Sequence, residues 1–189
     1  LPGAAVDVMG LARKMVQSGS NELARGMQSG QWPADVGRQL ADVQKQFALL
    51  NQLTAAPATQ TALVVAASEQ ADRTLLVAQT VTESIEKMAQ APSARLVNLA
   101  GRQRMLSQRL AKNYFLNAAK VESKVVQAQL VADAADFRQA LQTLKAAPVS
   151  TPAIRSELEL ADSQWLFFDS ALRRPADDAG LSALSLIHI

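Results

Sequence analysis

The sequence has no cysteine, and its single histidine, His188, stands next to the last residue. Without cysteine there can be no disulfide bond and no thiolate nucleophile. Histidine-based metal-binding spacings and glycine-rich phosphate-binding loops are also missing. These absences argue against an enzyme, and they predict that the chain uses no metal ion and no cofactor.

Aromatic residues, glycine and proline are scarce as well. Aromatics make up 4% of the 189 residues, and there are only 8 Gly and 7 Pro. The apolar residues are mostly Ala, Leu and Val, which together with many Gln favour helices over short strands separated by turns. The composition predicts an all-α fold, an antiparallel helical bundle of the four-helix-bundle type.

Long apolar runs and clustered positive charge are also absent. No stretch of about 18 apolar residues occurs, so we expect no membrane insertion in this segment. The formal net charge is only +2, and no group of lysines and arginines is dense enough to make several phosphate contacts. Nucleic acid is therefore not an expected partner.

Helical periodicity extends over most of the chain and is interrupted at glycine and proline positions. It predicts six helices, which fall at about residues 5–28, 34–54, 59–90, 94–120, 123–145 and 151–174. The sixth begins at Thr151-Pro152, a capping residue followed by proline in the first turn.

We predict that the six helices form two three-helix repeats; the alternative is chance matching between Ala-rich helices. A shift of 91 residues places Gly10 on Gly101 and Arg13 on Arg104, and it also aligns two Ala-Ala-Pro helix breaks. We predict three regions on this basis: a degenerate first repeat at 1–90, a second repeat at 91–180, and a tail at 181–189. The tail is expected to be a cloning remnant or a disordered end.

The predicted helix at about residues 94–120 carries several arginines. On a wheel of roughly 100° per residue, Arg104 shares a small, partly apolar face with Val97, Gly101 and Phe115. A buried cation there needs an acidic partner, backbone carbonyls or a bound anion. Gly101 costs about 1 kcal/mol against Ala, which close approach of a ligand or a helix would offset. Two interpretations stay open: an anion site, or a structural ion pair at a close helix crossing.

Other polar and aromatic residues are assigned ordinary structural roles. The wheel places Arg102 and Arg109 in solvent, and the acidic pair Asp133 and Asp136, on another charge-rich helix, is attributed to a solvated face. The aromatic segment Trp165-Leu166-Phe167-Phe168 is expected to fill the core of an Ala-rich bundle.

The signature of this helix is Val97-Asn98-Leu99-Ala100-Gly101-Arg102-Gln103-Arg104-Met105-Leu106-Ser107-Gln108-Arg109. It resembles the signature helix of PilJ-type sensor domains, the N-terminal domains of type IV pilus methyl-accepting chemotaxis transducers. These are related to the periplasmic domains of nitrate/nitrite sensor kinases. The resemblance implies a periplasmic four-helix bundle that senses nitrate, nitrite or another small anion, such as a small carboxylate, in chemotaxis or two-component signalling.

The resemblance also implies which residues bind the anion. In the nitrate sensors the ligand lies at the dimer interface between two signature helices, where the Arg and the backbone near the Gly contact it. The corresponding residues here are Arg104 and Gly101, and the repeat adds Arg13 and Gly10 as counterparts. Two facing arginines repel each other unless an anion lies between them. We therefore expect a homodimer or an intramolecular pseudo-dimer in which Arg13 and Arg104 share one anion.

The family's receptors also carry membrane helices and a signalling module, which this segment does not contain. We expect the ectodomain of a membrane receptor or a free-standing periplasmic protein, with a signalling protein as a candidate partner. An alternative layout is one four-helix bundle from about residue 59 to 174, with residues 1–57 as an accessory hairpin. An alternative function is a helical interaction module that docks a partner protein and binds no small molecule.

Overall fold

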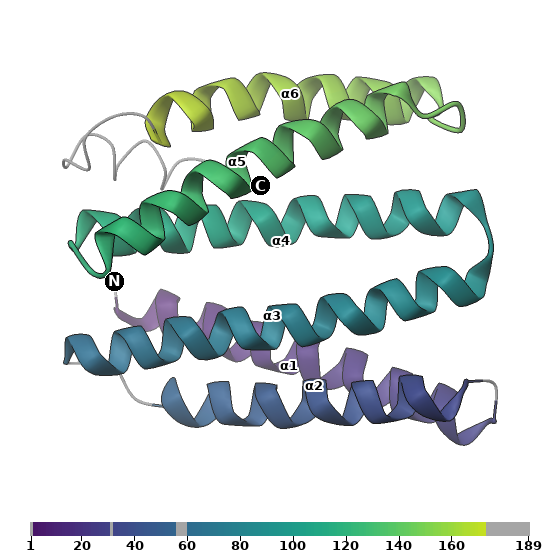
Figure 1. Cartoon of the computed structure of the whole chain (residues 1–189), viewed down its shortest axis with the longest axis horizontal. Coiled ribbons are helices and arrows are strands. Elements are labelled where there is room, and N and C mark those ends of the chain that lie inside the picture. Colours follow the sequence, from purple (N-terminus) through teal and green to yellow (C-terminus); the bar gives the residue numbers. More distant parts are fainter. Residues whose placement is uncertain (1, 31, 56–59, 173–189) are drawn as a thin grey trace. The chain divides into compact units, whose positions relative to one another are not determined.

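The structure, a computed structural model, describes residues 2–30, 32–55 and 60–172. These residues form six helices and no strand, which confirms the all-α fold class (Figure 1). The helices are α1 (Pro2–Gln28), α2 (Ala34–Leu53), α3 (Thr61–Ala89), α4 (Pro92–Ala118), α5 (Ser123–Ala146) and α6 (Pro152–Leu172). The predicted tail at 181–189 lies outside the described residues.

The chain divides into two compact units, residues 1–89 with α1 to α3 and residues 90–189 with α4 to α6. Each unit therefore contains three successive helices, in the order that a three-helix repeat requires. The 91-residue offset itself stays a prediction. None of the helices in the described ranges is long and apolar enough to cross a membrane.

In the first unit, the most extensive packing is between α2 and α3. Val36 and Leu40 of α2 and Val81 of α3 are buried. The side chain of Gln70 is buried on α3, and its Nε2 donates to the backbone oxygen of Gln46 at 3.0 Å and to its Oε1 at 2.9 Å. A buried amide must find such partners, so this contact fixes the register between the two helices.

In the second unit, α4 packs most extensively along α5, and α6 packs against α5. Leu106, Leu110 and Tyr114 supply the α4 side of the core. Phe137 of α5 stacks on Trp165 of α6, with ring centroids 4.2 Å apart. The hydrophobic core of this unit therefore lies between α5 and its two neighbours, α4 and α6.

The aromatic segment of α6 is divided between the core and the surface. Trp165 and Phe168 are buried, as predicted, but Leu166 and Phe167 are 68% and 74% exposed. The prediction of a core role is wrong for these two residues because neighbouring positions on a helix point about 100° apart. Four consecutive apolar residues cannot all face one core.

Local hydrogen bonds end α4 and begin α6, and so shape the turns between successive helices. After α4, Lys120 has a left-handed φ of 57°, and the amide of Val121 donates to Leu116 O at 2.9 Å, as in a Schellman ending. Before α6, the amide of Ile154 donates to Thr151 Oγ1 at 3.3 Å, so the predicted cap at Thr151 is present. Short, hydrogen-bonded turns of this kind let successive helices run antiparallel.

Candidate functional site

Helix α4 has one buried face and one exposed face. Leu106, Ser107 and Leu110 are buried. The opposite face consists of small and apolar residues around Arg104, and its exposed members are Val97, Ala100, Gly101, Arg104, Gln108 and Phe115. We call these six residues the open face of α4. The wheel grouped them correctly, but the expectation that Arg104 is buried is wrong within this chain.

Arg104 is the charged residue of the open face. Ser107 Oγ donates to its backbone oxygen at 2.8 Å, but the guanidinium has no hydrogen bond or ion pair with any residue that the structure describes. A β-carbon placed on Gly101, one turn earlier, would meet no atom within 4 Å. Neither a structural ion pair nor a close helix crossing is therefore found at this position within the described residues.

The other arginines of the signature helix have partners on α5. Arg109 makes a bidentate contact with Asp133, in which Nε donates to Oδ2 at 2.8 Å and Nη2 to Oδ1. Gln129 Nε2 adds a third donor to Oδ1 at 2.8 Å. The Asp133 side chain is only 1% exposed. The prediction that Arg109 and Asp133 are solvated is wrong, because each removes the cost of burying the other's charge.

Two further contacts extend this connection along the helix pair. Arg102 Nη2 lies 2.7 Å from Asp136 Oδ2, and Gln103 Nε2 donates to Phe137 O at 3.1 Å. Arg102 and Asp136 are both half-exposed, as expected of surface charges, but their pairing was not predicted. We call Arg102, Gln103 and Arg109 of α4, together with Asp133 and Asp136 of α5, the polar seam.

Sequence reasoning missed the polar seam although a signal for it was present. Arg102 and Arg109 are seven residues apart, and Asp133 and Asp136 are three apart, so each pair lies on one helix face. Opposite charges on adjacent antiparallel helices would then meet in pairs. The consequence for function is that two of the arginines are committed to α5, and Arg104 is left available.

The counterparts predicted from the first repeat lie in the first unit. Gly10 has open space where a β-carbon would be. Arg13 is half-buried and donates from Nε to Asn51 Oδ1 at 3.2 Å and from Nη2 to Thr54 O at 2.8 Å. Arg13 therefore binds the carboxyl end of α2, where unpaired backbone carbonyls attract a cation. A shared site for Arg13 and Arg104 stays a prediction.

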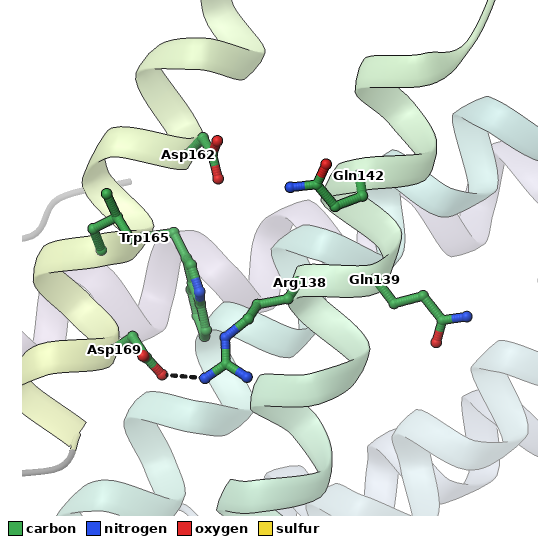
Figure 2. Close-up of a pocket in the computed structure, with 7 residues that line it drawn as sticks. Arg138, Gln139, Gln142, Asp162, Trp165 and Asp169 are labelled. Carbon is green, nitrogen blue, oxygen red and sulfur yellow. Dashed lines mark hydrogen bonds and ion pairs between the residues drawn. The ribbon is translucent and has the colours of Figure 1, made fainter.

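A pocket of about 440 Å³ lies between α5 and α6 (Figure 2). Figure 2 shows Arg138 beside Trp165, with its guanidinium bonded to Asp169, and the guanidinium carbon lies 5.7 Å from the Trp165 ring centroid. At the other end, Lys145 Nζ lies 2.6 Å from Asp162 Oδ2. Both cations are already neutralised, so this pocket is a weaker anion site than the open face of α4.

The fold and the site describe a helical domain with an unpaired arginine, among the described residues, on one exposed helix face. The PilJ family, described as Type IV pili methyl-accepting chemotaxis transducer N-term, matches residues 89–185, just over half of the chain and all of α4 to α6. The chain belongs to this family, which confirms the resemblance of the signature helix and makes the chain a sensing or signalling domain of the chemotaxis-transducer type. No curated protein and no solved structure gives a significant match.

Proposed function

We propose that this domain binds a small oxyanion, nitrate or nitrite, through the guanidinium of Arg104 and the backbone beside Gly101. It acts in the periplasm, as the ectodomain of a receptor or as a free-standing protein, and passes the signal to a chemotaxis or two-component partner. Membership of a chemotaxis-transducer family supports the signalling role. The choice of anion rests on the resemblance to nitrate sensors and on the shape of the guanidinium.

The observation that carries the proposal is the free guanidinium of Arg104. Its neighbours Arg102 and Arg109 are neutralised by Asp136 and Asp133, but Arg104 has no counter-charge among the described residues. A planar guanidinium presents donors in a fork that matches two oxygens of a planar oxyanion. Because Gly101 has no side chain, an anion can also approach the helix backbone closely.

The apolar surroundings of Arg104 suggest how water is kept from the anion. Val97 and Phe115, on the same face, are 71% and 48% exposed. If two copies of α4 meet through this face, these side chains are buried and the two Arg104 residues approach each other. The repulsion between them is relieved when an anion lies between them. The ligand then stabilises the dimer, and the dimer desolvates the ligand site.

Calorimetric titration of the whole chain with nitrate, nitrite and chloride tests the proposal. Nitrate or nitrite is expected to bind, and Arg104→Ala is expected to weaken binding by about tenfold or more, the effect of losing a charge-assisted hydrogen bond. Arg104→Lys keeps the charge but loses the planar fork, so it should recover only part of the affinity. Arg155→Ala, an exposed arginine on α6, is the matched control for loss of one positive charge.

The same titration distinguishes the alternative function. Exposed Leu166 and Phe167 on α6 favour a helical module that docks a partner protein. Equal binding of nitrate by the parent and by Arg104→Ala would refute the proposed site. If none of the anions produces heat, the interaction module becomes the better account of the domain.

A further inference from the structure

A second pocket, of about 220 Å³, lies between α4 and α5. It is lined mainly by polar residues from both helices: Arg95, Leu99 and Arg102 from α4, and Asp136, Gln139, Ala140 and Thr143 from α5. All seven residues belong to the second unit. Arg104 is not among them, because it follows Arg102 by two positions and so points about 200° away around the helix. The pocket is therefore separate from the open face of α4.

The charges in this pocket do not cancel. Arg102 uses Nη2 to bind Asp136, and its remaining donors have no partner among the described residues. Arg95 is exposed and forms no ion pair within the same described ranges. Two guanidinium groups and one carboxylate give a net charge of about +1, so the pocket attracts a single negative charge. Arg95 and Leu99 are four positions apart and Leu99 and Arg102 are three positions apart, so all three residues lie on one side of α4.

The remaining walls suit the rest of an organic anion. Leu99 and Ala140 provide apolar surface, and Thr143 and Gln139 provide polar groups. Thr143 Oγ1 donates to Gln139 O at 3.0 Å, so the hydroxyl oxygen can still accept a hydrogen bond. Gln139 lines both pockets, and in Figure 2 its amide points away from Trp165. The volume is below the roughly 300–1,000 Å³ of sites for drug-sized ligands, which limits the ligand to a few heavy atoms.

We propose that this pocket binds the carboxylate of a short organic acid between Arg95 and Arg102. The carbon chain of the acid packs on Leu99 and Ala140, and a polar substituent reaches Gln139 or Thr143. The ligand shares the α4–α5 groove with the polar seam, so binding there would stabilise the arrangement of the signature helix against α5. The domain would then have a second input that acts on the same helix as Arg104.

Titration of the 15N-labelled whole chain with L-lactate and L-alanine, followed by 1H–15N NMR at constant ionic strength, tests this proposal. The amides around residues 95–102 and 136–143 are expected to shift in a saturable way with at least one of the two probes. Binding of lactate alone, or of both, assigns the site to the carboxylate. Binding of alanine alone indicates recognition of the ammonium by Asp136, and its loss in Arg95→Ala then shows that the carboxylate is bound as well. If neither probe shifts these amides, the proposal is overturned.

Four variants test whether the binding depends on these residues. They are titrated with the probe that binds, or with lactate if both probes bind. Arg95→Ala should weaken binding by about tenfold, since one charge-assisted hydrogen bond is lost. Asp136→Asn should strengthen lactate binding, because it releases Arg102 from its ion pair and adds one unit of positive charge. Arg104→Ala and Arg155→Ala should leave the affinity unchanged. An Arg95→Ala protein that binds as the parent does, or an Arg104→Ala protein that does not bind, would show that the site lies elsewhere.

Discussion

The two units of the chain place the same pair of residues, a glycine and an arginine one turn later, in opposite situations. In the first unit, Arg13 is half-buried and donates to Thr54 and Asn51 at the end of α2. In the second, Arg104 is exposed and has no partner among the described residues. The same spacing of glycine and arginine can therefore connect one helix to its neighbour or leave a cation available to a ligand.

The difference follows from what the neighbouring helix offers. At the predicted offset of 91 residues, Asp133 corresponds to Asp42, which is exposed and accepts a hydrogen bond from Gln46 at 3.2 Å. At the same offset Arg109 corresponds to Ser18, which cannot form an ion pair. The second unit thus has the polar seam and holds α4 to α5 without using Arg104. Within the first unit, the described residues form no ion pairs of this kind between two helices, and Arg13 binds the end of α2 instead.

The largest effect that separates the two units is expected from the matched pair Asp133→Ala and Asp42→Ala. Asp133→Ala removes a buried acceptor of three hydrogen bonds and leaves Arg109 without its counter-charge, which should lower the free energy of unfolding by about 3 kcal/mol. Asp42→Ala changes an exposed residue and should alter it by less than about 0.5 kcal/mol. Urea unfolding followed by far-UV circular dichroism measures both. Equal losses would mean that the polar seam does not distinguish the units.

Much of the fold could be predicted from the sequence because long helices leave a strong periodic signal. The six predicted helices begin and end within three residues of the described ones. The break after α2 and the cap at Thr151 could be located for the same reason, since Pro and Thr act on the backbone locally. The family was also recognisable, because thirteen consecutive residues from Val97 to Arg109 carry its signature.

The side-chain roles were less predictable because they depend on the neighbouring helix. A helical wheel divides residues by their direction around one axis, but it does not identify which side another helix covers. The residues that share a face with Arg104 were identified correctly, but this face was expected to be buried and is exposed. Arg109 was expected to lie in solvent, but it is bound to buried Asp133. The average polarity of a face could not decide this, because two opposite charges that meet can be buried together.

The next largest effect concerns Arg13 and Arg104 themselves. Arg13→Ala removes hydrogen bonds to the end of α2 and should lower the free energy of unfolding by about 1 kcal/mol, with nitrate binding unchanged. Arg104→Ala removes an unpaired surface residue and should leave stability within about 0.5 kcal/mol while it weakens nitrate binding. Urea unfolding and calorimetry on the same two proteins measure both quantities.

This pair of variants also decides whether the two arginines share one anion. If Arg13→Ala weakens nitrate binding as much as Arg104→Ala does, the intramolecular pseudo-dimer is correct and the helix-end contact of Arg13 is secondary. If only Arg104→Ala weakens it, the anion is held by Arg104 from one or two copies of the chain. Sedimentation with and without nitrate then separates a monomeric site from a dimeric one.

The smallest effect is expected from the two glycines. Gly10 and Gly101 both have open space for a β-carbon, so replacing either by Ala should raise the free energy of unfolding by up to about 1 kcal/mol, the difference in helix propensity. The two substitutions should differ in nitrate titration. Gly101→Ala places a methyl group beside Arg104 and should weaken binding severalfold, whereas Gly10→Ala should have no effect. A Gly101→Ala protein that is more stable and binds nitrate as the parent does would show that this glycine gives no room to the ligand, and Arg104 would then have to hold the anion without the helix backbone.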